Sequence, residues 1–366
     1  MQLTDLVDEA SRQLTICNSC RYCEGYCAVF PALERRWSIT SGDVAHLANL
    51  CHDCRACYYA CMYAPPHEFG VDLPRVLADV RARTYRDHGW PAVAARLLDA
   101  GPRGMIAAGL AGVLAVLGLA AALGPPHRLL EAHTGPGSLY RLLPYAAMLT
   151  PFLVLGVWVA VAISAALVRF VRATGGSVIA VVDAGALLRA ARSALGLEYL
   201  RGGGDGCYYP DAAPSHVRRW LHGLTFYGFV LAFVATVAAA VMQDLMGLQP
   251  PFPILSPPVV LGGAGGLAMI GGTAGLGAMK WRSDPLPAST LMIARDYSFL
   301  VTLNLVSVSG MLTLVLRSTA AAGVLLVVHL GLVAALFLTM PYGKFVHFAY
   351  RYAALVRDRV EIRQAP

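Results

Sequence analysis

The chain has 366 residues, of which 57% are hydrophobic and 14% are charged, and its mean hydropathy is +0.57. Soluble domains carry roughly 25% charged residues, so this composition excludes an ordinary soluble globular protein and predicts a protein of the lipid bilayer. The net charge of +7 requires no nucleic acid partner, because the basic residues gather between long apolar stretches.

Eight of the nine cysteines form two runs of identical spacing near the start of the chain. Each run reads Cys-x2-Cys-x2-Cys-x3-Cys, the spacing by which bacterial-type ferredoxins bind two four-iron clusters. A turn with a cysteine at every third residue presents three thiolates on one side, and the fourth thiolate comes from elsewhere. The runs consist of Cys17, Cys20, Cys23 and Cys27, and of Cys51, Cys54, Cys57 and Cys61.

In two-cluster ferredoxins the fourth cysteine of each run binds the other cluster. We therefore predict two 4Fe–4S clusters, one bound by Cys17, Cys20, Cys23 and Cys61, the other by Cys51, Cys54, Cys57 and Cys27. Structural zinc is an alternative, but zinc prefers separated Cys-x2-Cys pairs, in which the third cysteine has no role. Disulfides are another alternative, but they need an oxidising compartment, and no cleavable signal peptide opens the chain.

The cysteine-rich head, residues 1–100, is expected to be helical. Helical patterns cover Leu3–Thr15, Ser41–Leu50 and Asp72–Tyr85, and the strand signal is poor. The proline that usually follows the fourth cysteine is replaced by Ala28 and Met62. These features favour an all-helical ferredoxin-like domain over the small β-rich kind.

Six long apolar stretches follow the head. Each exceeds the ~20 residues that cross a bilayer as a helix, and none alternates as a barrel strand does. The sequence therefore predicts an all-α protein whose membrane domain covers 101–350. The predicted spans are about 104–123, 143–168, 220–246, 258–279, 297–317 and 320–343, with a loop at 169–219 and a tail at 351–366. Within the loop we expect an amphipathic helix over 177–200 and a flexible segment over 202–214.

Basic residues mark one side of the predicted membrane domain. They precede the first span, fill the loop 169–219, lie between spans four and five and follow the last span, whereas the alternate connections hold few. Because cytoplasmic loops carry an excess of Lys and Arg, the head and the C-terminus are expected in the cytoplasm, at the inner membrane.

Three histidines, His222, His329 and His347, lie within or at the ends of spans, where ionisable groups are rare and usually functional. His222 and His347 lie at the cytoplasmic ends of spans three and six, so they can meet and bind one b-type haem through two axial nitrogens. Lys344, one turn before His347, is placed to meet a haem propionate. The alternative is that interfacial histidines only form hydrogen bonds at the headgroup level.

His329 lies 18 residues before His347, so both are expected on one face of one helix, about 27 Å apart along its axis. Span three has Ala232 at the matching depth, so a second haem on His329 would need another ligand, with Met242, Met246, His127 and His133 as candidates. A hydrogen-bonded membrane histidine is the competing interpretation. Cys207 has no partner spacing and is expected to be a buried thiol, or to line an electron route.

Longer motifs carry a family resemblance. The segment Met340-Pro-Tyr-Gly-Lys-Phe-Val-His347 resembles the last haem-binding helix of nitrate reductase gamma subunits, and the head resembles the C subunit of heterodisulfide reductases. Together with Gly203-Gly-Asp-Gly-Cys207 and Arg218-Arg-Trp-Leu-His222-Gly-Leu-Thr-Phe-Tyr-Gly228, they resemble the tricarballylate (citrate) utilisation protein B family over nearly the whole chain. The resemblance implies an electron carrier that reoxidises the flavin of a partner tricarballylate dehydrogenase and delivers electrons through clusters and haem b to quinone. In the gamma-subunit relatives the equivalents of His347 and His222 are paired.

Two classes of function are compatible with these features. A membrane-bound electron-transfer subunit explains why no nucleophile–base pair and no dinucleotide fingerprint is found, because the chemistry at carbon then occurs on a separate flavoprotein. An iron–sulfur-gated transporter or sensor should carry polar side chains inside several spans, whereas spans one, four and five read as almost wholly apolar. A cluster-dependent reductase acting alone is a third hypothesis.

Overall fold

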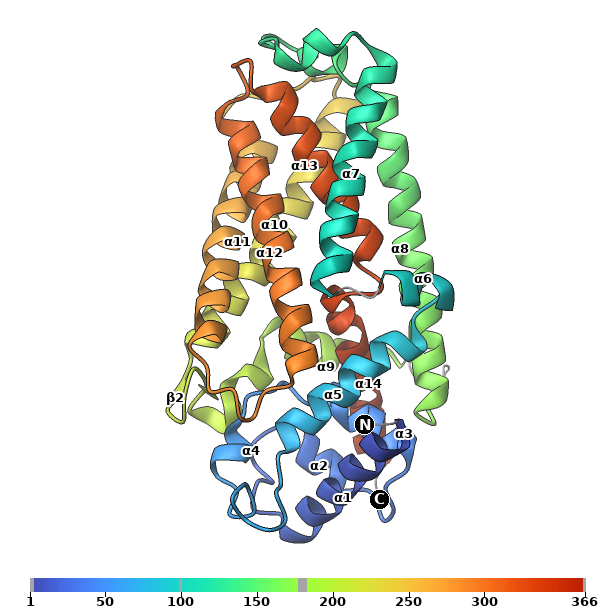
Figure 1. Ribbon diagram of the computed structural model, residues 1–366, viewed down its shortest axis with the longest axis vertical. Coiled ribbons are helices and arrows are strands. Elements are labelled where there is room, and N and C mark those ends of the chain that lie inside the picture. Colours follow the sequence, from blue (N-terminus) through green and yellow to red (C-terminus); the bar gives the residue numbers. More distant parts are fainter. Residues whose placement is uncertain (1–2, 99–100, 177–182, 365–366) are drawn as a thin grey trace.

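The computed structural model describes residues 3–98, 101–176 and 183–364 (Figure 1). A bundle of long helices stands on a head of shorter helices. The first and last described helices, α1 and α14, both lie at the head end. An all-helical fold is confirmed: within the described residues the strands are β1 (Cys207–Tyr208) and β2 (Pro214–Ser215), which pair with each other.

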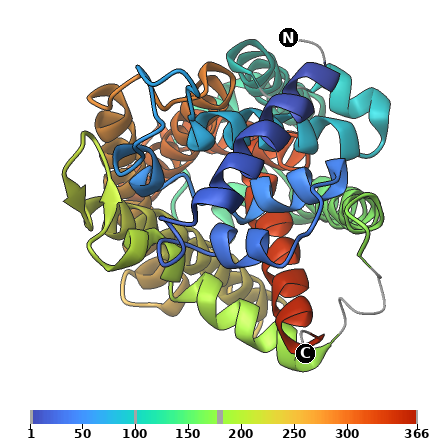
Figure 2. The ribbon, with the colours of Figure 1, turned by 90° about the horizontal axis from the view of Figure 1, so that it is seen from below.

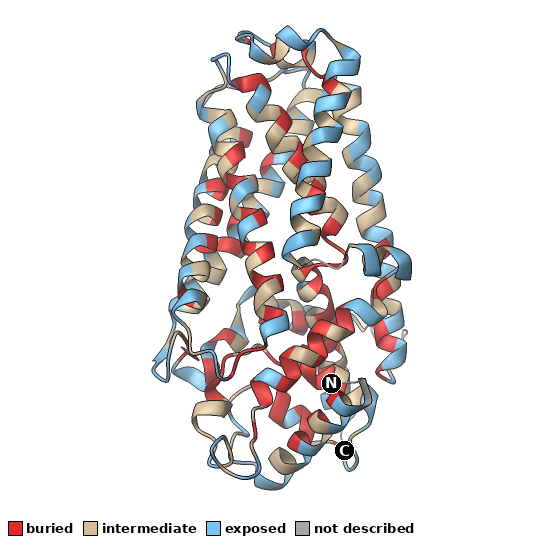
Figure 3. Ribbon diagram, in the orientation of Figure 1, coloured by how far each residue is buried: buried red, intermediate tan, exposed pale blue. Residues whose placement is uncertain are grey.

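The bundle consists of six helices long and apolar enough to cross a membrane. They are α7 (Pro102–Leu123), α8 (Tyr145–Ala173), α10 (Val217–Asp244), α11 (Pro257–Trp281), α12 (Thr290–Val315) and α13 (Ala322–Thr339). Their outward side chains are apolar and exposed, for example Leu110, Leu114 and Val157. In Figure 3 exposed and partly buried residues predominate in the bundle, whereas buried residues concentrate in the head. Apolar surface of this extent needs lipid around it, so the protein is a multi-pass membrane protein.

The head consists of α1 (Leu3–Cys20), α2 (Val29–Glu34), α3 (Ser41–Leu50), α4 (Ala56–Tyr59), α5 (Leu73–His88) and α6 (Ala92–Leu97). The three predicted helices correspond to α1, α3 and α5. Helix α3 begins where a capping box forms, because the Thr40 hydroxyl accepts from the Asp43 amide and the Asp43 carboxylate accepts from the Thr40 amide. Leu14, Leu47 and Leu77 form the buried centre of the head.

Short 3-10 helices and one amphipathic helix fill the connections. The 3-10 helices are η1 (Pro126–Leu130), η2 (Ser138–Arg141), η4 (Glu198–Gly204) and η5 (Lys344–Val346). The amphipathic helix expected over 177–200 is observed as α9 (Ala184–Leu195), while 177–182 lie outside the described residues. Ala186 and Ala190 of α9 are fully buried in the head core.

The prediction that His329 and His347 share one helix is wrong. Helix α13 ends at Thr339, and α14 (His347–Gln364) begins after a break over 340–346. Pro341 within this break cannot donate a backbone hydrogen bond, and proline ends or kinks a helix for that reason. His347 therefore belongs to a separate helix that enters the head.

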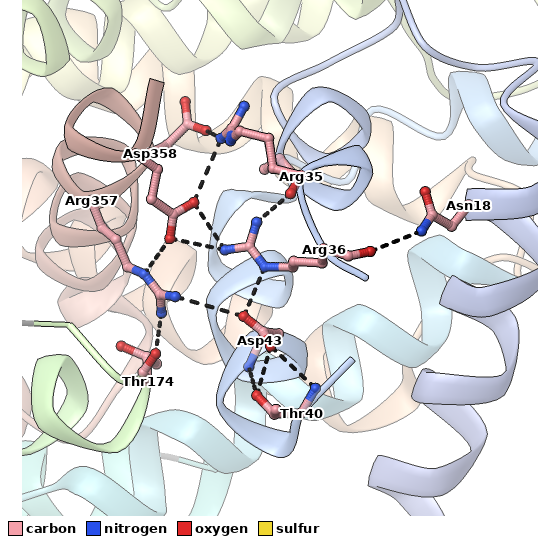
Figure 4. Close-up of polar contacts among 10 residues, drawn as sticks. Asn18, Arg35, Arg36, Thr40, Asp43, Thr174, Arg357 and Asp358 are labelled. Atoms are coloured by element: carbon pink, nitrogen blue, oxygen red, sulfur yellow. Dashed lines mark hydrogen bonds and ion pairs between the residues drawn. The ribbon is translucent and has the colours of Figure 1, made fainter. Parts of the chain in front are cut away.

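Helix α14 occupies the segment expected to be a tail, 351–366, as far as residue 364. Ala354, Leu355 and Val356 are buried in the head core. Figure 2 shows α14 (red) running past the blue head helices towards α9. Ion pairs hold it there: Arg36 binds Glu361 at 3.0 Å, Arg357 lies 3.6 Å from Asp43, and Arg35 pairs with Asp358 (Figure 4). The last segment of the chain is thus part of the head.

Helix α12 is more polar than the predicted fifth span. Its buried residues include Arg295, Asp296, Ser298, Thr302, Ser307 and Ser309. Most of the hydroxyls are satisfied within the helix, as in the bond from Ser307 to the Leu303 carbonyl at 2.7 Å. Arg295 and Asp296 lie before the predicted span 297–317, but Ser298, Thr302, Ser307 and Ser309 lie within it, so span five is less apolar than expected.

Helices α7 and α13 approach so closely that glycine is required at their crossing. A Cβ added at Gly112 would lie 2.3 Å from the Gly331 carbonyl oxygen, whereas one added at Gly118 would meet nothing within 4 Å. We expect Gly112→Ala to destabilise the protein by about 1–3 kcal/mol through overpacking. Thermal unfolding in detergent should show a lower Tm for Gly112→Ala and an unchanged or slightly higher Tm for Gly118→Ala. Equal Tm values for the two variants would contradict this packing.

Candidate metal centres

The cysteines of the head form two groups that are drawn from both runs. The outer cysteine group, Cys17, Cys20, Cys23 and Cys61, lines one cavity together with Cys57, Tyr22, Met62 and other residues. Cys20 is exposed and the other three are partly buried. Burial, together with the thiols of Cys61 and Cys23, raises the pKa of Cys17 to about 12. Cys61 of the second run therefore lies beside the cysteines of the first run.

The inner cysteine group is Cys27, Cys51, Cys54 and Cys57. Burial, with the thiols of Cys54 and Cys51 nearby, raises the pKa of Cys27 well above its usual range. Cys51 and Cys54 are buried, and the backbone amide of Asp53 donates to the Cys51 thiol over 3.4 Å. Here a cysteine of the first run lies among those of the second run.

The chemistry of both groups fits iron–sulfur clusters. Four thiols are the ligand set of a 4Fe–4S cluster. Among the described residues, no three His, Cys, Asp or Glu side chains are close enough to hold a single metal ion. A cluster of four irons is larger than a zinc ion, so its ligands stand farther apart than those of a zinc site. The assignment of individual cysteines to clusters stays a prediction.

Four arginines surround the inner cysteine group, and we name them the arginine collar: Arg55, Arg81, Arg218 and Arg351. Arg81 Nη1 donates to the Cys51 carbonyl at 2.7 Å, and Arg351 Nη2 donates to the same carbonyl at 2.8 Å. Arg218 donates to the carbonyls of Asp53 and His52 at 2.6 and 3.1 Å. Burial and the nearby charge of Arg81 lower the pKa of Arg351 to about 10, which reflects the crowding of cations.

The segment expected to be a flexible loop, 202–214, is packed against the inner cysteine group. The Tyr208 amide donates to the Cys54 carbonyl at 2.9 Å. The Tyr209 ring lies between the Arg55 and Arg218 guanidiniums, 4.0 and 4.6 Å from its centre, and its hydroxyl donates to Asp53 at 2.7 Å. Cys207 is fully buried, as predicted, and its thiol lies 3.7 Å from Arg218 Nη1.

His222 and His347 meet between the bundle and the head. Their ring centres are 6.3 Å apart and the ring planes cross at 65°. A metal about 2 Å from each imidazole nitrogen would separate the ring centres by about 6 Å, so the pair fits two axial ligands of one iron. His222 Nδ1 is buried and has no hydrogen-bond partner among the described residues.

The surroundings of His347 prepare it as a ligand. Its Nδ1 lies 2.7 Å from the Lys344 carbonyl, and an Nδ1–H donor there leaves Nε2 for a metal. Burial, with Lys344 and Arg351 nearby, lowers the pKa of His347 well below its usual range, which keeps the imidazole neutral. The two imidazoles therefore fit the ligands of a b-type haem iron, and both histidines stay predicted ligands.

Lys344 lies in an ion-pair cluster with α11 and α12. Its ammonium is 2.7 Å from Asp296 Oδ1, and the Lys280 ammonium is 2.6 Å from Asp296 Oδ2. Its role towards a haem propionate stays a prediction, and in this structure its carboxylate partner is Asp296.

His329 lies deep in the bundle, away from the histidine pair. Its Nδ1 is 3.1 Å from both the Ser309 hydroxyl and the Val306 carbonyl. His133 Nε2 lies 2.8 Å from the Arg128 carbonyl, and His127 lies 3.7 Å from Glu131. These contacts favour the interpretation of His329 as a hydrogen-bonded membrane histidine.

Sequence reasoning missed most of the arginine collar and Tyr209. Arg81 belongs to no motif and is one of several basic residues before the first span, and Arg55 stands between two cysteines without a spacing signal of its own. Arg218 and Arg351 each lie four residues from a predicted haem ligand, which is the signal that could have found them.

The fold defines the class: a multi-pass helical membrane protein with a ferredoxin-like head. Residues 10–87 match a family model described as "Citrate utilization protein B Fer4-like domain", and residues 99–366 match one described as "Citrate utilization protein B". The chain is 40% identical over 365 residues to a "Citrate utilization protein B" from Escherichia coli, covering 99% of this chain and 94% of that protein.

The chain therefore belongs to the citrate utilization protein B family, as its motifs predicted. The Fer4-like match indicates an iron–sulfur-binding head. No solved structure matches the chain.

Proposed function

We propose that the protein carries electrons from the reduced flavin of a partner dehydrogenase, which acts on tricarballylate or a citrate-type acid, to membrane quinone. The route consists of two 4Fe–4S clusters in the head and a haem b at the histidine pair, with the head in the cytoplasm. The family and its citrate-utilising relative support the metabolic setting. Iron–sulfur clusters and haem supply one-electron steps, which divide a two-electron flavin oxidation.

One observation carries this proposal: the segment 51–54 of the inner cysteine group is tied to both predicted haem ligands. Arg218 donates to this segment and lies four residues before His222; Arg351 donates to it and lies four residues after His347. Four residues of helix rise about 6 Å. The inner cysteine group and the histidine pair are thus joined by two short, partly buried connections.

The outer cysteine group offers the point of entry. Cys20 is exposed, and Tyr22 and Met62 beside it are each 61% exposed. A flavoprotein that docks here would bring its flavin close to a cluster without entering the bilayer. The reduced flavin loses two electrons and two protons, and quinone takes up two electrons and two protons to become quinol.

A small pocket at the head end of the bundle supports the quinone end of the route. It lies where α7, α12 and α13 meet the break before α14. Its lining combines apolar side chains with two basic ones: Met105, Phe299, Leu336, Met340, Phe345, Arg295 and Lys344, with Thr339 and Gly343. The Lys344 carbonyl in this lining also accepts from His347. An apolar pocket with few polar groups suits a quinone ring, whose carbonyls accept hydrogen bonds.

Filling this pocket should slow electron delivery to quinone. We expect Met105→Trp to slow reoxidation of reduced haem by a short-chain quinone about tenfold, a barrier increase of about 1.4 kcal/mol. Ile106→Trp is the matched control, because Ile106 is 64% exposed on the outer face of the same helix. The rate of haem reoxidation is measured for both variants by stopped-flow absorbance. Equal reoxidation rates would place the quinone elsewhere.

The route as a whole is tested in membrane vesicles that contain the full chain. Haem b absorbance should change to the reduced form when the flavoprotein and its acid substrate are both added, and return when quinone is added. Haem that stays oxidised with an active dehydrogenase present would overturn the proposal. Labelled tricarboxylate uptake without the dehydrogenase would instead support the transporter hypothesis, for which the buried polar residues of α12 are the one favourable observation.

A further inference from the structure

The two cysteine groups differ sharply in the charge around them. The four guanidiniums of the arginine collar come from separate elements. Arg55 immediately precedes α4, and the other three arginines lie within α5, α10 and α14. Arg55 and Arg81 are each 2% exposed. Among the described residues that line the cavity of the outer group there is no Arg or Lys. Arg21, which follows Cys20, is exposed, so water screens its charge.

Negative charge near the collar compensates only part of it. The Asp53 carboxylate accepts from Tyr209, and Arg218 binds the backbone carbonyl of Asp53. Arg55 also donates to a backbone carbonyl, that of Asp284, at 3.0 Å. The contacts of the collar are thus largely with neutral carbonyls, and the positive charge of the inner site exceeds the negative charge of Asp53.

Reduction of a 4Fe–4S cluster adds one negative charge to it, so nearby cations stabilise the reduced form. Exposure acts in the opposite direction, because water around the outer group also stabilises added charge. Water is mobile and lies on one side of the outer group, whereas the collar is fixed and acts at the lower dielectric of a buried site. The four collar cations outnumber the nearby carboxylates of Asp53, Asp72 and Asp284, and this excess of positive charge outweighs the difference in exposure.

We propose that the arginine collar makes the inner cluster the more easily reduced of the two, so that electrons pass from the outer cluster to the inner one. In this step one electron leaves the outer cluster, which is oxidised, and reduces the inner cluster, with no bond or proton change. The inference rests on the proposed function and assigns the direction of electron transfer, which is from the water-exposed face of the head towards the histidine pair.

The first test uses the full chain, purified anaerobically in detergent and titrated with dithionite and mediators while the clusters are followed by EPR. Two midpoint potentials should be resolved, and the inner cluster should be reduced first. Cys20→Ser identifies the outer cluster, because Cys20 is exposed and its replacement alters the signal of that cluster alone. A higher midpoint for the outer cluster, or equal midpoints, would overturn the inference. This measurement needs no variant of the collar.

The second test removes collar charge. Arg351→Gln should lower the reduction equilibrium constant of the inner cluster about tenfold or more, a midpoint change of about 59 mV for one electron, and leave the outer cluster unchanged. Arg351→Lys keeps the charge and should keep the midpoint. If Arg351 acts only by capping a backbone carbonyl, Arg351→Gln and Arg351→Lys should have the same effect on the midpoint potential of the inner cluster. Arg357→Gln, on the same helix but paired with Asp43 and Glu361, is the matched control.

The outcomes also separate this inference from the proposed function. Clusters with the expected order of midpoints, in a protein that never reduces quinone, would overturn the function and leave the collar's effect standing. Quinone reduction by a protein whose inner cluster has the lower midpoint potential would overturn the effect of the collar and leave the proposed function standing. Purified protein without iron would overturn both.

Discussion

Replacing Cys20 and Cys54 together by serine should abolish haem reduction by flavoprotein and substrate. Each substitution removes one thiolate from a different cysteine group, and a serine hydroxyl is a poor substitute for a soft thiolate ligand. No intermediate redox centre would then remain between the flavin and the histidine pair. We expect the initial rate of haem reduction to fall by on the order of a thousandfold, about 4 kcal/mol of barrier.

This result is measured as the change in haem absorbance in membrane vesicles, with iron content determined on the same preparation. Cys207→Ser is the matched control, because Cys207 is a buried cysteine close to the inner group but outside both runs. It should retain both clusters and most of the rate. Unchanged haem reduction in the double variant would exclude the clusters as the route.

Replacing His347 by alanine should remove haem b while leaving the iron–sulfur clusters in place. The substitution deletes one of two imidazoles whose ring centres lie 6.3 Å apart, and a single axial ligand holds haem weakly. Because loss of supporting contacts alone costs 10–100-fold in metal affinity, loss of a ligand should cost about 100-fold or more. Purified His347→Ala should therefore show little b-type absorbance.

Two further variants make this measurement specific. His216→Ala, an exposed position at the start of α10, should retain the haem of the unmodified protein. His329→Ala reports on a second haem: its hydrogen bonds to α12 suggest that haem content stays the same. Full haem content in His347→Ala would show that the histidine pair is not the haem site.

The helical class, the six spans and the family were predictable from sequence because each rests on a local pattern. An apolar stretch of span length and a strict cysteine spacing report directly on neighbours along the chain. The predicted helix Ser41–Leu50 agrees with the observed one at both ends, and a capping box of Thr40 and Asp43 forms at its start. The pairing of cysteines across the runs stays a prediction, and the structure places Cys61 beside Cys17 and Cys27 beside Cys51 and Cys54.

The errors arose where contacts between distant segments decide. The expected long helix through His329 and His347 is broken at 340–346. The expected tail is instead the helix α14, because ion pairs and a buried face of α14 bind this helix to the head. The loop 202–214 is ordered for the same reason, since Tyr208 and Tyr209 find partners at Cys54 and Asp53.

The sequence by itself determined that this is a helical membrane protein with two four-cysteine runs in its head, since hydropathy and spacing act over short stretches of chain. Only the tertiary structure decided that four arginines from separate elements converge on one of the two cysteine groups. Charges from residues 55, 81, 218 and 351 become neighbours only through packing. Their combined effect on a buried site therefore has no signature in local sequence.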